Sequence, residues 1–303
     1  MSFDSRTITY LQTTDTEFRT WVAAIIAQLT AIGLTQTADT GQINTATVTT
    51  PAVINTAQGY AIFRYNDTLH ATSPIFFKLE FGSGGAITTP SMWLTVGKGT
   101  NGAGTITTTV RARIQRSLNA NATGVVNTAA YDPSIGCVWA QWSSAYASNS
   151  FISMVLHRGC DINTWLPEPN TFSTWFSTST ATAPITQDLV LNASASNGGV
   201  PNMFSLSESS GIAGQVPPLI NFRPVLYPLH YCYPASALGN GQGWRTFPGV
   251  MGIQSAWWYP FQRTRLTFKG TTRVYVTHGH PGFMGGLGAN GNIRERFACV
   301  VPS

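Results

Sequence analysis

The chain has 303 residues, of which 43% are hydrophobic and only 10% are charged, and its formal net charge is +5 with an isoelectric point near 9.2. This length and apolar content suffice for one large β domain or two ordinary domains. Because charge is so scarce, Thr, Ser, Asn, Gln and Gly must cover the surface, which favours a subunit of a permanent assembly over a crowded cytosolic enzyme. The basic residues are scattered, which argues against a groove that binds nucleic acid.

The N-terminal part of the chain predicts one amphipathic helix. Thr14-Asp15-Thr16-Glu17 fits a capping box, and Gly33 is suited to end the helix after Ile32. Between them, apolar residues recur at helical spacing and form a stripe. The stripe residues are Phe18, Trp21, Val22, Ile25, Leu29 and Ile32. The stripe fits two interpretations: a helix packed on its own domain, or an assembly helix that docks on a neighbouring subunit.

Residues 35–59 predict an extended arm, because they are polar, rich in Thr and Ala, and without aromatic residues. One edge strand is expected near residues 46–49, and Pro51 argues against a central strand. The sequence thus divides into residues 1–59, a helix and arm for docking and assembly, and residues 60–303, an antiparallel β domain. Since the arm has too little apolar content to fold alone, we expect it to lie on a neighbouring subunit or another protein of the assembly.

Four strand-like pieces follow the arm. Residues 60–65, 75–81 and 92–96 are short aromatic and aliphatic runs with turn residues between them. The fourth piece, residues 106–115, has the clearest pattern, because its side chains alternate with a period of two, so that one face is half-buried. The residues of that face are Ile106, Thr108, Val110, Ala112 and Ile114.

The rest of the chain contains further strand candidates and no second segment in which apolar residues recur at helical spacing. Residues 136–144 and 151–158 predict a strand pair, whereas residues 163–176, which contain two prolines and two tryptophans, are expected to be irregular. The last strand candidates are residues 257–259, 264–269, 273–278 and 293–301. Strands without intervening helices indicate a mainly β fold, an antiparallel sandwich or barrel-like domain behind the N-terminal helix and arm.

No motif in the sequence points to catalysis. Gly97-Lys98-Gly99-Thr100-Asn101-Gly102 matches the dinucleotide pattern G-x-G-x-x-G, but an alternating strand follows instead of the helix whose amides would bind phosphate, so we interpret it as a hairpin loop. P-loop and nucleophile-elbow motifs are absent, and the carboxylates are scattered along the chain. We therefore predict no enzymatic activity and no cofactor.

The four cysteines are interpreted as buried free thiols, since they lie in apolar runs and form no C-x-x-C pair. They are Cys137, Cys160, Cys232 and Cys299. The first residues, MSFDSRTITY, lack the basic and apolar regions of a secretory signal, and no apolar run reaches the length of a membrane span. Neither export nor membrane insertion is expected.

Two segments resemble a recurring pattern in structural proteins of tailed bacteriophages. They are YNDTLHATSPIFFKLEFG at residues 65–82 and WLTVGKGTNGAGT at residues 93–105. The helix and the Thr-rich arm fit that pattern as well, so the resemblance covers roughly the first third of the chain. It implies a virion subunit without an enzymatic step, which forms a homo-oligomer, a trimer or hexamer, and contacts other virion proteins but neither nucleic acid nor membrane.

The resemblance leaves three functions open. Low charge, the arm, the docking helix and long loops such as residues 197–218 favour a tail or baseplate component. A capsid decoration or cement protein would have similar physical properties. A receptor-binding or polysaccharide-binding module would present exposed aromatic residues in its loops, such as Trp244 or Trp257-Trp258.

His278-Gly279-His280 is the candidate metal site. Its two imidazoles share a face if the chain is extended, and three chains around a three-fold axis would offer six ligands, enough for an octahedral transition metal. The resemblance implies such a site, because His-x-His sites of this kind occur at the axes of phage tail tips and fibres. The other interpretation is a polar strand end that runs into the Pro281-Gly282 turn, with both rings hydrogen-bonded to water or backbone.

Overall fold

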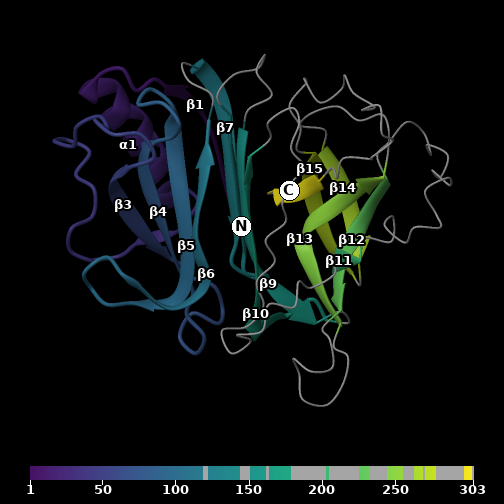
Figure 1. Cartoon of the computed structure of the whole chain (residues 1–303). Helices are drawn as coiled ribbons and strands as arrows, with labels where there is room; N and C mark the ends of the chain where they lie inside the picture. The colour runs from purple at the N-terminus through teal and green to yellow at the C-terminus, as the bar shows by residue number, and fades with distance from the viewer. Residues whose placement is uncertain are drawn as a thin grey trace.

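The predicted mainly β fold with one N-terminal helix is confirmed (Figure 1). The computed structural model describes residues 1–118, 122–143, 151–161, 164–178, 203–204, 225–232, 244–254, 263–268, 270–277 and 297–301. The elements are β1 (Ser2–Tyr10), α1 (Asp15–Ala31), β2 (Thr35–Gln36), β3 (Ala57–Arg64), β4 (Phe76–Ser83), β5 (Pro90–Thr100), β6 (Ile106–Ser117), β7 (Ala122–Asp132), β8 (Cys137–Ser143), β9 (Phe151–Asp161), β10 (Pro167–Thr178), β11 (Met203–Phe204), β12 (Val225–Cys232), β13 (Trp244–Gln254), β14 (Arg263–Phe268), β15 (Thr271–Thr277) and β16 (Phe297–Val301).

The strands form two antiparallel sheets. The smaller sheet has the order β2-β3-β4-β5-β6, in which β3 to β6 are consecutive antiparallel neighbours. The larger sheet runs in the order β1-β7-β8-β9-β13-β16-β15-β14, with β10 paired to β9, β12 to β13 and β11 to β12. The predicted strand pair at residues 136–144 and 151–158 is confirmed as β8 and β9.

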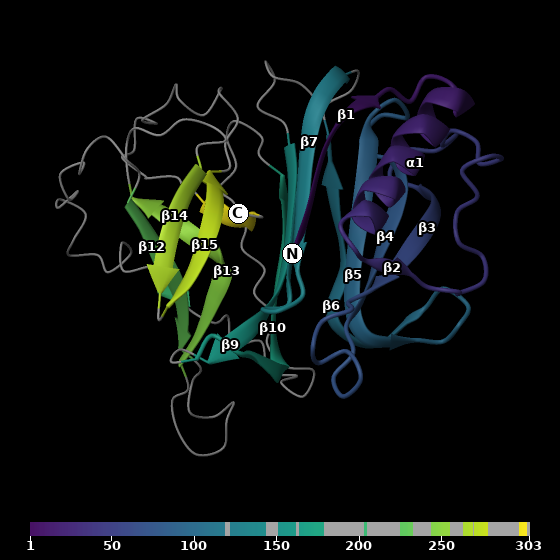
Figure 2. The same cartoon turned by 180° about the vertical axis from the view of Figure 1, so that it is seen from behind.

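The strand β9 carries the larger sheet from one half of the molecule to the other. Its residues 151–157 pair with β8, whereas Cys160 and Asp161 pair with β13. Figures 1 and 2 show β9 and β10 between the strands that face the smaller sheet and the group formed by β11 to β15.

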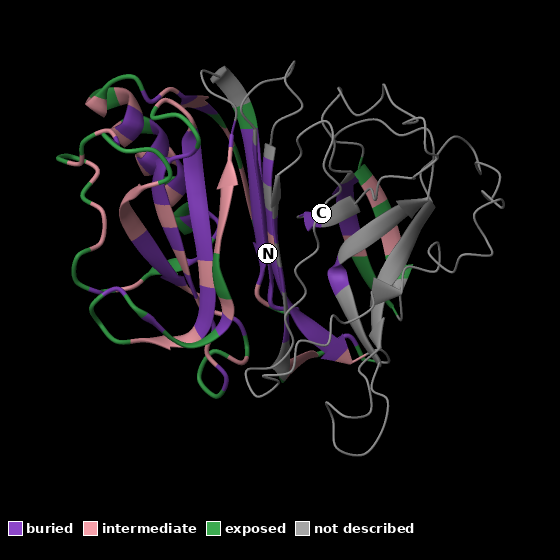
Figure 3. Cartoon of the chain, viewed as in Figure 1, coloured by how far each residue is buried: buried purple, intermediate pink, exposed green. Residues whose placement is uncertain are grey.

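Residues 127–132 of β7, together with the described residues of β8 and β9, form a middle layer that packs against a core on each face (Figure 3). In β8, Val138, Ala140 and Trp142 face a first core, which includes the smaller sheet and α1. Cys137 and Trp139 of the same strand face a second core, which includes β15 and β16. Since successive side chains of a strand point to opposite faces, a layer buried on both sides needs an almost continuous apolar run, as β8 has.

The helix α1 begins as the sequence predicts, but it packs on its own subunit. Glu17 N–H donates to Thr14 Oγ1 at 3.3 Å and Thr14 N–H donates to Glu17 Oε2 at 3.0 Å, which completes the capping box. All the stripe residues have no exposed area and belong to the first core, and Figure 2 shows α1 beside β1. The predicted assembly role of the stripe is therefore wrong, because a surface covered by its own chain cannot contact a neighbour. The residues concerned are Phe18, Trp21, Val22, Ile25, Leu29 and Ile32.

The arm, residues 35–59, also lies on its own chain. Its first residues form β2, which pairs with β3. Further along, Thr37 N–H donates to Ile62 O at 2.9 Å and Ile43 N–H donates to Tyr60 O at 2.8 Å. The arm thereby covers an edge of β3 whose main-chain groups would otherwise be unpaired. The prediction that the arm lies on a neighbouring subunit is wrong, because these bonds are made within the subunit.

The second half of the arm is fastened to α1. Thr50 N–H donates to Asp15 Oδ1 at 2.8 Å, and Arg19 Nε donates to Val48 O at 2.6 Å. Since β1 pairs with β7 and α1 packs in the first core, residues 1–59 belong to the same folded unit as the strands that follow. This corrects the predicted domain boundary after residue 59.

Three local predictions differ from the structure. In β6, the alternation predicts Thr108 and Ala112 on the half-buried face, but both are exposed. Register shifts against β5 insert extra residues and turn the following side chains to the other side. Residues 163–176, expected to be irregular, contribute most of β10, whose Pro167 stands at the strand start, where a missing N–H is tolerated. Residues 46–49 contain a turn instead of an edge strand.

Candidate functional site

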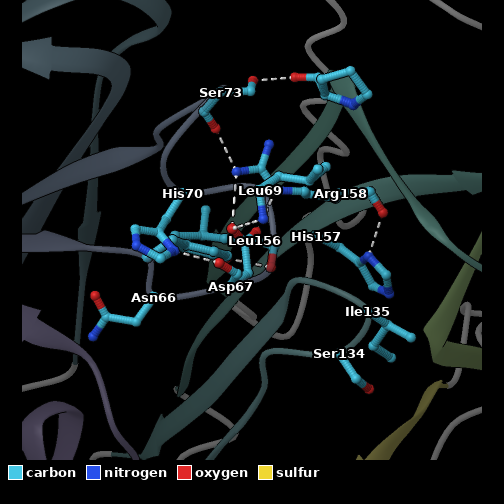
Figure 4. A network of polar contacts seen from close by, with 12 residues as sticks. Asn66, Asp67, Leu69, His70, Ser73, Ser134, Ile135, Leu156, His157 and Arg158 are labelled. Carbon is cyan, nitrogen blue, oxygen red and sulfur yellow. Dashed lines mark hydrogen bonds and ion pairs between the residues drawn. The ribbon is translucent and has the colours of Figure 1, made fainter.

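A buried polar junction lies where the middle layer meets the smaller sheet (Figure 4). Arg158 on β9 donates through Nε and Nη2 to the two carboxylate oxygens of Asp67, in the connection between β3 and β4. Arg158 Nη2 also donates to Ser73 O at 2.6 Å. Neither charged side chain has exposed area, so each charge depends on the other instead of on water. We define the polar junction as Tyr65, Asp67, Tyr131, His157 and Arg158.

The turn between β7 and β8 makes room for the charged pair at Gly136. Its φ is +58°, in the left-handed region that glycine adopts without strain. A Cβ at this position would lie 2.8 Å from Arg158 Cγ and 2.9 Å from Asp67 Oδ2. Gly136 O also accepts the Arg158 N–H at 2.9 Å, so the turn is bonded to the strand that it approaches.

Two buried phenols extend the polar junction. The Tyr65 hydroxyl donates to Leu156 O at 2.5 Å, and Asn66 N–H donates to the Tyr131 hydroxyl oxygen at 2.9 Å. The two rings meet edge to face with their centroids 5.6 Å apart. Burial raises the pKa of both phenols, so both stay neutral beside the Asp67 carboxylate.

His157 links the polar junction to β13. Gly249 N–H donates to His157 Nε2 at 2.8 Å, and His157 Nδ1 lies 2.5 Å from Arg158 O. This pattern assigns the neutral tautomer with the proton on Nδ1. Burial lowers the pKa of His157 to about 3, which agrees with a neutral ring.

The thiols near the junction are buried. Cys137 and Cys160 are free, which confirms the sequence interpretation for these two. Burial raises the pKa of Cys160, so its thiol stays protonated. Cys232 and Cys299 lie on β12 and β16, and for them the interpretation stays a prediction.

The chemistry of the polar junction is that of a structural link. The charges of Asp67 and Arg158 neutralise each other, and the phenols, the imidazole and the Cys160 thiol are held neutral. Their hydrogen bonds connect the middle layer to the smaller sheet on one side and to β13 on the other. The arrangement fixes the relative positions of the layers.

A second polar cluster ties the arm to the Gly-rich loop. Of the six residues predicted as a hairpin loop, residues 97–100 form the end of β5, and only Asn101 and Gly102 lie in the connection between β5 and β6. Asp39 accepts hydrogen bonds from Thr37 Oγ1 at 2.6 Å, from Thr100 Oγ1 at 3.1 Å and from Gly104 N–H at 3.3 Å. Burial acts to raise the pKa of Asp39, but these hydrogen bonds act more strongly together and lower it.

Most of the candidate site residues from the sequence lie outside the part of the chain that the structure describes. His278 and His280 lie outside the described residues, as do Trp257 and Trp258, while Trp244 begins β13. The described part of the chain holds no group of three or more His, Cys, Asp or Glu that could bind a metal ion.

Sequence reasoning missed the pair of Asp67 and Arg158, although one signal pointed to it. Arg158 stands in the apolar strand FISMVLHRGCD, and a charged residue in a buried strand needs a partner. Its partner lies 91 residues away along the chain, and nothing local selects it among twelve carboxylates.

Comparisons with known proteins add no family to this picture. A scan against protein-family models, a search of curated proteins and a search of solved structures each found no match. Within the described residues, no helix is long and apolar enough to cross a membrane. The structure defines the class of protein as a layered, antiparallel, mainly β protein with one helix.

Proposed function

We propose that the chain is a structural subunit of a tailed-bacteriophage virion, a tail or baseplate component that assembles with copies of itself and with other virion proteins. The observation that carries this proposal is the distribution of the few charged residues along the chain. The buried pair joins the layers from within, whereas residues 40–63 and 81–97 contain no charged residue. A surface without charge loses little hydration free energy when a neighbouring subunit covers it.

The rigidity of the subunit also supports this proposal. The middle layer belongs to both cores, and the polar junction ties it to the smaller sheet. A subunit whose layers are already fixed spends little conformational entropy when it joins an assembly. The helix and the arm no longer support attachment, because both lie on their own subunit. The assignment to tail or baseplate therefore depends on the resemblance of residues 65–82 and 93–105 to phage structural proteins.

Purified phage particles test the proposal. Mass spectrometry of particles from the phage that encodes the chain should find it at a fixed copy number, and gold-labelled antibodies should mark the tail or the baseplate. Labelling of the capsid would assign it to decoration instead, and absence of the chain from washed particles would refute the proposal.

A further inference from the structure

The connection between β5 and β6 begins with Asn101-Gly102, in which an amide side chain stands directly before a residue that has no side chain. Both residues are exposed. Among the described residues, a Cβ built on Gly102 would meet no atom within 4 Å apart from its chain neighbours, so hydroxide from the solvent can reach the Gly102 N–H. This N–H donates to Thr100 Oγ1 at 3.3 Å, which is longer than an ordinary N–H···O bond and holds the proton weakly. The Gly102 nitrogen is therefore available as a nucleophile.

The same loop polarises the side-chain amide of Asn101. Its Oδ1 accepts the Ala103 N–H at 2.9 Å and the Thr105 N–H at 3.0 Å. Two main-chain donors on one carbonyl oxygen stabilise the negative charge that develops on it when a nucleophile attacks the carbon. The main chain is fixed as well, because Asn101 N–H donates to Thr105 O at 3.1 Å and Gly102 O accepts the Thr40 N–H at 2.9 Å. The nucleophile and the amide next to it are thus held in one ordered loop.

We propose that Asn101 is a modification site, at which this loop promotes conversion of the asparagine to aspartate and isoaspartate. The deprotonated Gly102 nitrogen bonds to Asn101 Cγ, the bond from Cγ to Nδ2 breaks, and Nδ2 takes up a proton from water and leaves as ammonia. The product is a cyclic succinimide. Water then opens the ring at one of its two carbonyl carbons, which gives aspartate or, when the main chain continues through the side chain, isoaspartate. Solvent supplies the water, and nothing is oxidised or reduced.

The loop suits an aspartate at this position. The aspartate keeps an oxygen in front of the Ala103 and Thr105 N–H groups, and hydrogen bonds to a charged acceptor are stronger than those to an amide. The carboxylate of Asp39, which accepts the Gly104 N–H of the same loop, acts against the new charge. Since Asn101 is exposed, solvent screens this repulsion, whereas the two hydrogen bonds to Oδ1 are direct.

The isoaspartate has a different effect on the arm. It adds one methylene group to the main chain between residue 101 and Gly102, and therefore displaces Gly102. The Gly102 carbonyl holds the arm through the N–H and the Oγ1 of Thr40. We expect the isoaspartate form to hold the arm less firmly than the aspartate form, with faster amide hydrogen exchange at Thr40. The inference concerns this loop whatever the chain assembles with, so its failure would leave the proposed function standing.

Peptide mapping by mass spectrometry tests the proposal on the folded, full-length chain in mildly alkaline buffer. The peptide that contains Asn101 should first lose the mass of ammonia and then show the mass increase of an amide-to-acid change, and enzymatic methylation should detect its isoaspartate. Asn55 is the control in the same sample, because it is exposed and has a φ of +55°, but the side chain of Thr56 hinders attack by the next nitrogen. Asn55 should remain an amide while Asn101 converts.

A pair of variants tests the contribution of the loop. Ala103→Pro removes one N–H donor to Asn101 Oδ1 and should slow conversion by about tenfold or more, because one lost oxyanion donor slows acyl transfer in enzymes by at least that much. Ala103→Ser keeps the donor and should convert like the wild type. Hydrogen exchange at Gly104 checks that the loop is intact in both variants. Equal rates in the two variants, conversion that is faster in urea than in the folded chain, or an Asn101 that stays an amide would each overturn the inference.

Discussion

Asp67 and Arg158 have no exposed side-chain area, so no water can replace a lost partner. The chain also offers a contrasting pair on β1, where Arg6 Nε lies 2.6 Å from Asp4 Oδ2 and both side chains keep contact with solvent. Loss of one charge leaves a buried partner uncompensated, whereas solvent takes over the hydration of an exposed partner. At the scale of the residue, the two pairs therefore differ in the burial of their side chains and not in the distance between their charged atoms.

We expect Asp67→Asn to lower the free energy of unfolding by about 3–5 kcal/mol, because it leaves the Arg158 guanidinium unpaired. The control Asp4→Asn should change it by less than about 1 kcal/mol. Urea titration followed by circular dichroism measures both. Adding Arg158→Met to Asp67→Asn should recover part of the loss, since no unpaired charge then remains. Equal effects of Asp67→Asn and Asp4→Asn would contradict the role of the pair.

His157 predicts a loss of stability in mild acid. Its pKa of about 3 in the folded protein lies below the ordinary value of 6.5, so the unfolded chain takes up the proton first. The stability that neutral His157 contributes is therefore complete above pH 6.5 and is lost as the pH falls towards 3, by at most about 1.4 kcal/mol per pH unit. Urea titrations at several pH values should show this slope in the wild type and a flatter one in His157→Gln. The same slope in both proteins would assign the effect to other groups.

At the scale of the element, the sequence predicts those elements that are determined by residues close together in the chain. The helix α1 was predictable because its capping box and apolar stripe both lie within a few turns. The position of the arm was not, because main-chain bonds to β3, such as that from Thr37 N–H to Ile62 O, leave no trace in side-chain pattern. The shifted register of β6 could not be predicted either, because it also depends on main-chain pairing with another strand. In the sequence, Thr108 is simply part of a regular alternation. The polar junction joins residues far apart in the chain, so only the fold reveals it.

Asp39 should control how firmly the arm holds the Gly-rich loop. We expect Asp39→Asn to speed amide hydrogen exchange at Gly104 by roughly tenfold, the scale expected when a hydrogen bond to a charged acceptor becomes one to a neutral acceptor. Exchange at Thr50, whose N–H donates to Asp15, should not change, whereas Asp15→Asn should affect Thr50 alone. Nuclear magnetic resonance or mass spectrometry resolves these amides. Equal exchange at Gly104 in wild type and Asp39→Asn would show that Asp39 does not hold the loop.

At the scale of the whole molecule, the middle layer makes the two cores depend on each other. Trp139 lies in the second core and donates through its indole N–H to Val300 O at 2.8 Å, while its neighbours Val138 and Ala140 lie in the first core. Damage to the first core therefore acts on strands that the second core also needs. Residues 1–59 contribute β1, α1 and the cover of β3 to this arrangement.

Removal of residues 1–59 should consequently prevent folding of the remaining chain. The deletion strips the first core of α1 and β1, including Phe18, Trp21 and Tyr10, and it exposes edges of β3 and β7 to intermolecular strand pairing. We expect residues 60–303 alone to aggregate and to show no cooperative thermal transition in near-ultraviolet circular dichroism. Co-expression with residues 1–59 as a separate polypeptide should restore soluble protein, because the missing contacts are non-covalent. A soluble, cooperatively unfolding fragment of residues 60–303 would instead re-establish a domain boundary after residue 59.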